Sequence, residues 1–315
     1  MLVSLSIPDR LAGGLWGLLV GDALGVPYEF HAPSALPPRE QLDMTPPADF
    51  QRAHARVPVG TWSDDGAQAL ALLASLLHCH ELDLDDFGRR LLNWQDWGYL
   101  AVDGEVFDIG IQTSRALQAL RSGTPPALAG PRDEMANGNG SLMRVLPLAL
   151  WHRGSDLDLI RQAERQSLVT HGHLRAQVCC ALYCLWARRL LQEATDPWHE
   201  VIATLHQHYG DDSLAWEQLA WHVRPHDPPD GSGSGYVVDC LRSARWAVET
   251  GHSYEAVVKN AISLGRDTDT TACVAGGIAG IQYGWQGIPE RWRQQLRGRD
   301  LFEPLLKQLV QAHHA

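Results

Sequence analysis

The chain has 315 residues, of which 45% are hydrophobic and 20% are charged, a composition typical of a globular protein with enough apolar residues for a core. This composition excludes a disordered tail, a collagen-like repeat and a disulfide-rich miniprotein. The 26 Lys and Arg residues are outnumbered by 37 Asp and Glu residues, and the net charge of −11 disfavours non-specific binding to nucleic acid or to an anionic membrane.

The N-terminal segment is apolar but lacks the features of a signal peptide. It has no basic start, Asp9 and Arg10 precede the apolar stretch, and Asp22 closes it. No stretch elsewhere approaches the roughly 18 apolar residues of a transmembrane helix. The six cysteines form no C-x-x-C pair, so we expect small buried side chains in a reducing compartment rather than disulfides or zinc ligands. We therefore expect a cytoplasmic protein without a membrane partner.

Helical periodicity dominates the chain. Apolar residues recur at three- and four-residue steps in stretches rich in Ala and Leu, whereas the alternation typical of strands is nearly absent. Helices are expected over residues 66–78, 109–121, 173–194, 236–249 and 268–284. Further helix starts are indicated at Asp86, at Pro197 and after Ser253. The sequence therefore predicts an all-α fold.

Two irregular segments are candidates for domain linkers. Residues 31–60 are rich in Pro and polar residues, and residues 225–235 form a loop of Pro, Gly and Ser. Polar motifs near both ends of the chain, however, make chemical sense only if they meet in space. We therefore predict a single domain over residues 1–315, with functional loops.

The first acidic motif lies in residues 60–73. Asp64 and Asp65 stand just ahead of a predicted helix, where free N–H groups and the helix dipole stabilise negative charge. Taken alone, this motif is typical of a helix cap, with Ser63 or Asp64 as the N-cap residue.

A second acidic motif changes that interpretation. Asp267, Asp269 and three threonines stand at the start of the small-residue helix predicted over 268–284. If the two motifs meet, four carboxylates repel strongly unless they are protonated or bridged by cations. Ligands that are all oxygens suit Mg²⁺ or Mn²⁺ rather than zinc. A site for two divalent cations accounts best for both motifs.

Weaker signals accompany these motifs. Residues 137–141 form a Gly- and Asn-rich run that is either a backbone nest for a phosphate or a plain tight turn. Asp22 and Glu29 are either exposed acids or bases or ordinary surface carboxylates, and Asp108 stands at another helix start, where capping is the default. His171, two residues before a second histidine, lacks the partners of a zinc site.

Taken in order, the motifs resemble those of the ADP-ribosylglycohydrolase family, which includes the dinitrogenase reductase-activating glycohydrolases. The resemblance extends from the first motif to IPERW at 288–292. The motifs are GDALGVPYE (21–29), WSDDG (62–66), FDIG (107–110), NGNGSLMR (137–144), THGH (170–173), GSGYVVDCL (233–241), and LGRDTDTT (264–271) followed by AGGIAGIQYG (275–284). Its specificity lies in the ordered set, since any one motif alone is a chance match.

The resemblance implies a compact orthogonal multi-helix bundle with a dinuclear Mg²⁺ or Mn²⁺ cleft. It also implies hydrolysis of the glycosidic bond between ADP-ribose and an acceptor, with release of ADP-ribose. The implied metal ligands are Ser63, Asp64, Asp65, Asp267, Asp269 and Thr270. The implied substrate-binding residues are Asp108, Gly138, Asn139, Gly140, Ser141 and His171 around the distal ribose and diphosphate, and Gly235 and Tyr236 toward the adenosine. Glu29 is implied beside the metals, and Glu29, Asp64 and Asp65 are alternative acceptors for the proton of the attacking water.

Three positions depart from the family's usual pattern. Gly66 stands where Thr is frequent, Ser63 stands where Thr is frequent but keeps the hydroxyl, and Arg266 stands where a small residue is common. The four aspartates are intact, so these departures bear on how the leaving group is held, and Arg266 is a candidate contact to it or to a phosphate.

Other functions are compatible with the same motifs. The chain could be a catalytically inactive ADP-ribose binder or scaffold. A family member that had lost catalysis, however, has no reason to keep clustered carboxylates that repel one another. It could also be a dimetal phosphohydrolase, which would release AMP instead of ADP-ribose. The acceptor on the substrate, an ADP-ribosylated protein or another conjugate, is open: arginine is the leading candidate, with serine, a base or a small molecule as alternatives. We expect residues 31–60 and 99–107 to form the leaving-group pocket.

Overall fold

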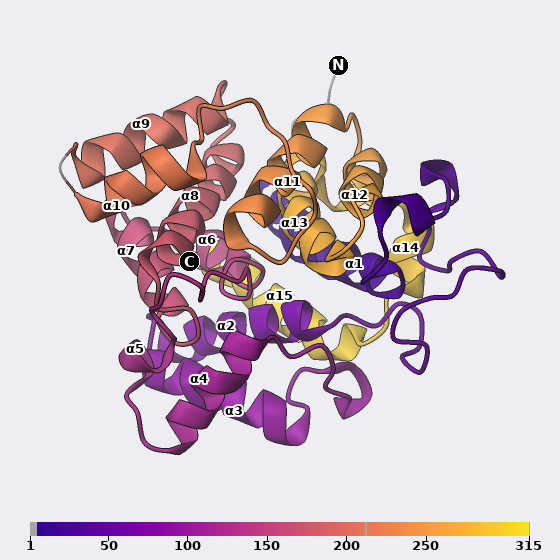
Figure 1. Cartoon of the computed structure of the whole chain (residues 1–315), viewed down its shortest axis with the longest axis horizontal. Coiled ribbons are helices and arrows are strands. Elements are labelled where there is room, and N and C mark those ends of the chain that lie inside the picture. The colour runs from indigo at the N-terminus through magenta and orange to yellow at the C-terminus, as the bar shows by residue number, and fades with distance from the viewer. Residues whose placement is uncertain (1–4, 212, 315) are drawn as a thin grey trace.

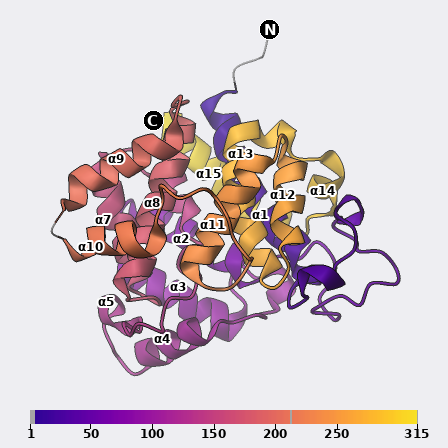
Figure 2. The ribbon, with the colours of Figure 1, turned by 45° about the horizontal axis from the view of Figure 1, so that its top comes forward.

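The computed structural model describes residues 5–211 and 213–314, so residues 1–4 of the N-terminal segment discussed above lie outside the described part. The described residues form helices joined by loops and contain no strand, only one isolated β-bridge between Gly138 and Tyr236 (Figures 1 and 2). The all-α prediction is therefore confirmed. The helices in chain order are α1 (Ile7–Gly25), η1 (Val26–Tyr28), η2 (Pro33–Ala35), η3 (Arg39–Gln41), α2 (Asp64–Cys79), α3 (Leu84–Trp97), η4 (Val102–Gly104), α4 (Ile111–Arg121), α5 (Pro126–Ala129), α6 (Leu146–Trp151), α7 (Asp156–Ser167), α8 (Leu174–Leu191), α9 (Pro197–Tyr209), α10 (Leu214–Glu217), η5 (Gln218–Val223), α11 (Val237–Thr250), α12 (Tyr254–Ser263), α13 (Thr268–Gly287), α14 (Glu290–Gln295) and α15 (Arg299–His314).

The helices predicted from periodicity are all present, as α2, α4, α8, α11 and α13, with ends displaced by a few residues. Pro197 is the first residue of α9, and the Ser253 hydroxyl caps α12 by accepting the Ala256 N–H at 3.1 Å. The start predicted at Asp86 is wrong. Helix α3 begins earlier, at Leu84, because Asp83 already supplies the capping oxygen and accepts the Asp86 N–H at 2.9 Å.

The centre of the bundle is the pair formed by α1 and α13, which run side by side, with α11 and α12 against α13 (Figure 1). Glycines occur at every fourth residue of α1 from Gly13 to Gly25, which places them on one face of the helix. A Cβ added to Gly280 of α13 would lie 1.9 Å from the Gly13 carbonyl oxygen, so the two backbones are in direct contact. The small residues of both helices therefore set how closely the two halves of the chain approach.

Helix α1 is a core helix. Together with the following turn it is long and apolar enough to cross a membrane by length and composition, but 94% of its most apolar window is buried inside the protein. The cysteines are unpaired, and all except Cys79 are buried, as expected for small core side chains.

Both irregular segments are anchored to the bundle. In the first, which follows α1, Arg39 donates to Asn260 of α12 at 2.6 Å and the Asp43 carboxylate accepts the indole N–H of Trp292 in α14. In the second, Arg245 of α11 donates to the carbonyls of Pro225 and Asp227. These contacts hold the two loops against α11, α12 and α14.

Candidate active site

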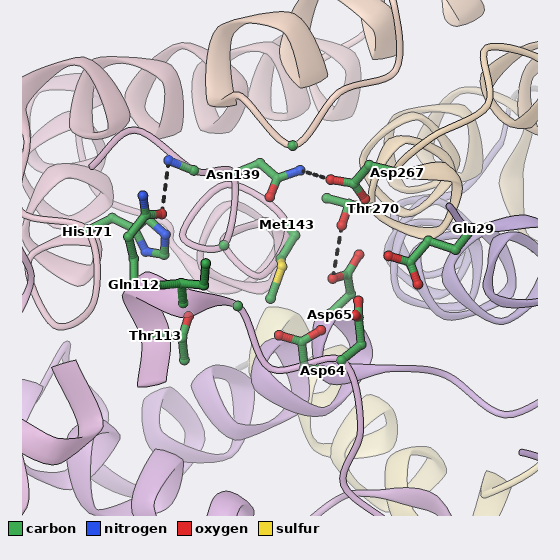
Figure 3. Close-up of a pocket in the computed structure, with 16 residues that line it drawn as sticks. Glu29, Asp64, Asp65, Gln112, Thr113, Asn139, Met143, His171, Asp267 and Thr270 are labelled. Carbon is green, nitrogen blue, oxygen red and sulfur yellow. Dashed lines mark hydrogen bonds between the residues drawn. The ribbon is translucent and has the colours of Figure 1, made fainter. Parts of the chain in front are cut away.

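A cavity of about 310 Å³ lies where the starts of α2 and α13 meet the segment that follows α1 (Figure 3). Its walls come from segments far apart in the sequence. The lining residues are Glu29, Asp64, Asp65, Asp108, Gly110, Ile111, Gln112, Thr113, Gly138, Asn139, Gly140, Met143, His171, Gly235, Asp267 and Thr270. The tertiary structure thus brings together the two acidic motifs that the sequence separates by about two hundred residues.

The start of α2 supplies the first pair of carboxylates. Ser63 is the N-cap residue, and its hydroxyl accepts the Asp65 N–H at 3.3 Å, so the capping interpretation of this motif is correct as far as it goes. The carboxylate of Asp22 in α1 is fully buried and accepts the N–H groups of Ser63 at 2.9 Å and Gly66 at 2.8 Å. These bonds satisfy free donors of the first helical turn and leave the side chains of Asp64 and Asp65 to face the cavity.

The start of α13 supplies the second pair. Asp267 occupies the N-cap position without making a capping bond, and its carboxylate accepts instead from the Asn139 side-chain amide at 2.9 Å. The Thr270 hydroxyl donates to Asp65 at 3.3 Å, which links the two helix starts directly (Figure 3). Asp269 is fully buried and accepts the backbone N–H of Thr270 at 2.9 Å.

Glu29 belongs to two groups of potential metal ligands. One oxygen from each of Glu29, Asp267 and Asp269 lies within 4.8 Å of the others, and the same holds for the ligand atoms of Glu29, His54 and Asp108. The His54 ring nitrogen Nε2 lies 2.6 Å from Glu29 Oε2. Two neighbouring sets of potential metal ligands therefore share one carboxyl group.

The electrostatics of this cavity oppose ionisation. Burial, reinforced by neighbouring carboxylates, holds the pKa values of Asp64, Asp65 and Asp269 well above their usual range. Burial and then the Asp108 carboxylate raise the pKa of Glu29 to about 11, and burial is the main cause that raises the pKa of Asp108 to about 6. Without counter-charges Glu29 retains its proton near neutral pH, and each of these aspartates binds a proton more readily than a free carboxyl does.

Divalent cations fit this donor set. The Oδ2 atoms of Asp65 and Asp269 are buried and have no hydrogen-bond partner, a state that costs free energy unless another group satisfies them. Hard cations such as Mg²⁺ or Mn²⁺ accept carboxylate and hydroxyl oxygens, and they neutralise the repulsion described above. The described residues thus present candidate clusters of carboxylates and one histidine, and the binding of two cations by the two acidic motifs stays a prediction.

The opposite wall of the cavity is built by the 137–141 loop and His171 (Figure 3). Gly138 donates its N–H to Gln112 at 3.1 Å, and Asn139 donates its N–H to the Gly235 carbonyl at 3.1 Å. These two N–H groups are therefore engaged within the protein and are not free for a phosphate. Burial, and then the charge of Arg144, lowers the pKa of His171 to about 3, so its imidazole is neutral.

The family pattern of the ADP-ribosylglycohydrolases matches residues 4–315. The chain belongs to this family. It is 31% identical over 304 residues to the ADP-ribosylarginine hydrolase Tri1 of Pseudomonas putida, covering 96% of this chain and 78% of that protein. It is 27% identical to the ADP-ribosyl-[dinitrogen reductase] glycohydrolase of Rhodospirillum rubrum, covering 92% and 91% of the two chains.

A solved structure extends the comparison to three dimensions. A chain of an ADP-ribosylglycohydrolase-related protein complex superposes with a TM-score of 0.78 at 31% identity, covering 97% of this chain and 98% of that chain. The resemblance inferred from the motifs is thereby confirmed, and so is the all-α fold of an ADP-ribosylglycohydrolase.

Not every residue implied by that resemblance faces the cavity of this family member. Ser63 and Asp269 are buried just behind its lining residues. Ser141 is fully buried, and its hydroxyl accepts from Ser167 at 2.8 Å, so it supports the loop instead of lining the cavity. Tyr236 lies in an adjoining hollow, where its hydroxyl accepts from Arg175 at 3.1 Å.

Several residues of the site carried no readable signal in the sequence. Gln112, Thr113 and Met143 line the cavity, but their types are ordinary within helices and loops. His54 stands in the irregular segment before α2, where no pattern distinguishes it. Among the residues behind the cavity, Asp22 is the one that the sequence marks, because a carboxylate within an apolar, glycine-rich helix requires a hydrogen-bond partner when it is buried.

The structure accounts for two departures from the usual family pattern. A Cβ at Gly66 would lie 2.7 Å from the Trp62 ring and 2.9 Å from Leu19, so packing excludes a larger residue there. Arg266 does not line the cavity, and its guanidinium donates to the Ser232 carbonyl. In this structure the Arg266 side chain braces the 225–235 loop, and its contact to the leaving group or a phosphate stays a prediction.

Proposed function

We propose that the chain acts, as a single domain, as a divalent-cation-dependent hydrolase of the bond between ADP-ribose and an acceptor, with protein arginine as the acceptor. The observation that carries this proposal is the convergence of four aspartates from two helix starts, two of them with buried oxygens that lack a partner. Support for arginine comes from the relatives named ADP-ribosylarginine hydrolase, which are 31% and 29% identical to this chain.

The cations would be held by the two helix starts. The proposed ligands are Ser63, Asp64, Asp65, Asp267, Asp269 and Thr270. When bound, Mg²⁺ or Mn²⁺ lowers the pKa of a coordinated water and makes a nucleophile available near neutral pH. The fixed backbone of the two helix starts keeps these side chains in place before substrate arrives, which is the condition for efficient electrostatic stabilisation.

The substrate would occupy the length of the cavity. Asp108, Gly138, Asn139, Gly140 and His171 would contact the distal ribose and the diphosphate, and their place in the cavity lining supports this. Gly235 stands at the border of the adjoining hollow and lines both spaces, and Tyr236 lies in that hollow, which suits the adenosine end. Ser141 would act from behind by holding the loop.

In the proposed reaction the bond between the anomeric carbon and the acceptor atom breaks, and the oxygen of a water bonds to that carbon. The water proton passes to Glu29, Asp64 or Asp65 and from there to the acceptor, which leaves with this proton in place of the sugar. Positive charge develops on the ribose during departure, and the surrounding carboxylates stabilise it. The products are ADP-ribose and the unmodified acceptor.

The test is mass spectrometry of the products after incubation with Mg²⁺ or Mn²⁺ and a panel of arginine-, serine- and base-linked ADP-ribosyl substrates. We expect intact ADP-ribose from the arginine-linked substrate. Asp65→Asn and Asp269→Ala should each lower turnover at least about 100-fold, since even groups that only orient a metal ligand are worth 10- to 100-fold. Cation binding should weaken in parallel, measured by calorimetry.

Asp85→Asn is the matched control, because Asp85 lies in the first turn of α3 as Asp65 does in α2, but on the surface. It should leave turnover and cation binding unchanged. Release of AMP would replace this proposal with a phosphohydrolase that cuts the diphosphate. Tight ADP-ribose binding without turnover of any substrate would identify a binder or scaffold on the same fold.

A further inference from the structure

Three aromatic side chains form a row beside the acidic end of the cavity. The His54 ring lies between Phe30 and Phe107, with ring centroids 5.5 Å and 5.0 Å away, respectively. The three residues come from the turn after α1, the 31–60 segment and the segment before α4, so only the tertiary structure assembles them. We call Phe30, His54 and Phe107 the aromatic row.

The aromatic row is joined to two carboxyl groups of the cavity. Phe30 directly follows Glu29, Phe107 directly precedes Asp108, and His54 Nε2 lies 2.6 Å from Glu29 Oε2. Glu29 and His171 lie at opposite sides of the cavity (Figure 3). In the proposed binding mode the ribose and the diphosphate lie on the His171 side. The row therefore borders the end at which an acceptor would leave the ribose.

The backbone of the row is held in an uncommon conformation. Phe30 has φ 63°, His54 has φ 45°, and Asp108, beside Phe107, has φ 58°. Positive φ is unfavourable for bulky residues and persists where the surroundings enforce it, here through the Phe30 N–H, which donates to the Arg266 carbonyl at 2.6 Å. Packing does not explain this placement, because the Phe30 side chain is 70% exposed.

The chemistry of the row suits a flat cation. Aromatic faces attract a guanidinium, and its fork of N–H donors matches adjacent carboxyl oxygens such as those of Glu29 and Asp108. A serine acceptor offers neither a charge nor a planar group. We propose that the aromatic row binds the guanidinium of an ADP-ribosylated arginine and selects this acceptor over serine. The inference rests on the proposed hydrolase function and adds the residues that choose its acceptor.

The test compares Phe30→Ala and Phe107→Ala with the unaltered protein on arginine- and serine-linked ADP-ribosyl peptides of one sequence, with Mg²⁺ present. We expect KM for the arginine-linked peptide to rise about 5- to 30-fold for each variant, the upper part of the range for a cation on an aromatic face, which applies because the bound guanidinium covers the ring. The kcat value for that peptide, the KM for the serine-linked peptide and the Kd for free ADP-ribose should change by less than about 3-fold, because none of them depends on holding the guanidinium.

Conservative variants separate ring chemistry from bulk. Phe30→Tyr should retain the low KM for arginine, whereas Phe30→Leu, which keeps apolar volume without an aromatic face, should behave like Phe30→Ala. Trp97→Ala is the control, since Trp97 is an aromatic residue 82% exposed at the end of α3 and lines no part of the cavity. It should leave every constant unchanged.

The outcomes distinguish this inference from the function on which it rests. Equal losses on both peptides, or full activity of Phe30→Leu, would overturn selection by the aromatic row while leaving the hydrolase intact. If the unaltered protein hydrolyses no peptide, the proposed function fails. Binding alone then tests the aromatic row. The variants should raise the Kd for the arginine-linked peptide and leave the Kd for ADP-ribose unchanged. Equal changes in the two Kd values would overturn the inference.

Discussion

The two acidic helix starts each supply a pair of aspartates to the site, but they are held in place in different ways. At the start of α2, a side chain does the holding: the Asp22 carboxylate reaches from α1 and accepts the N–H groups of Ser63 and Gly66. At the start of α13, the backbone does it: a Cβ at Gly25 of α1 would lie 2.4 Å from the Asp269 Cα. The Thr268 hydroxyl adds a hydrogen bond to the Gly25 carbonyl at 2.8 Å.

In both arrangements the aspartates are held in place by residues of the same helix, α1. Because α1 carries Asp22 and Gly25 within one turn, it sets the spacing between the two pairs of aspartates. The hydrogen bond from Thr270 to Asp65, at 3.3 Å, then closes the distance between the two starts. A contact between backbones tolerates no added atom, whereas a hydrogen-bonded anchor can relax, so the two starts should respond differently to substitution.

The largest effect is expected at the backbone contact. Gly25→Ala places a methyl group against the Asp269 Cα and the Thr268 carbonyl, so α13 must shift. We expect a loss of about 3 kcal/mol in the free energy of unfolding, the upper part of the range for overpacking, measured by urea denaturation. Cation binding should be lost with it, because Asp267 and Asp269 move with the helix start.

Gly88→Ala in α3 is the matched control for this substitution. An added Cβ there meets its nearest neighbour at an ordinary 3.5 Å, and alanine favours a helix over glycine. This variant should be as stable as the unaltered protein or more stable by up to about 1 kcal/mol. Full cation affinity in Gly25→Ala would show that α1 does not position the α13 start.

A smaller effect is expected at the hydrogen-bonded anchor. Asp22→Asn keeps one acceptor oxygen and turns an amide N–H toward N–H groups of the α2 start. We expect a loss of about 1–2 kcal/mol in the free energy of unfolding and a decrease of about tenfold in cation affinity. Chemical denaturation and calorimetry measure the two quantities, with Asp85→Asn as the neutral control. An unchanged variant would mean that the Ser63 cap alone holds this start.

The smallest effect is a pH dependence of stabilisation by cations. In the cation-free folded protein the pKa values of Asp108 and Glu29 are raised to about 6 and about 11. In the unfolded chain these two carboxyls have their ordinary pKa values of 3.8 and 4.5. Above those ordinary values the folded state therefore keeps protons that the unfolded state releases. The stability of the cation-free protein therefore falls as the pH rises from there through the raised values. Cations displace these protons, so their stabilising effect grows with pH.

Thermal unfolding with chelator and with Mg²⁺ at pH 6 and pH 8 measures this difference. We expect Mg²⁺ to stabilise the protein by roughly 1.4 kcal/mol more at pH 8, the equivalent of about a tenfold gain in affinity. Asp65→Asn should abolish the difference, since it removes a proposed ligand. An equal increase in Tm at the two pH values would contradict cation binding by the acidic helix starts.

The sequence alone was sufficient for the fold class and for the acidic motifs. Periodicity located helices such as α2 and α13, because burial of one helix face imposes a repeat that the sequence must carry. It also placed Asp64, Asp65, Asp267 and Asp269 at helix starts, where local backbone chemistry favours them. Family membership followed from the order of the motifs and was confirmed by the family match over residues 4–315.

What only the tertiary structure decided depends on contacts between distant segments. Asp22 and Gly25 anchor the two acidic starts because α1 packs along α13, and no local pattern encodes which carboxylate or glycine meets which helix end. His54 and Phe107 come from irregular segments, where neither periodicity nor capping constrains residue type, yet they meet Phe30 beside Glu29. Local interactions determined the elements and their chemistry, whereas long-range packing determined which of these residues share one cavity.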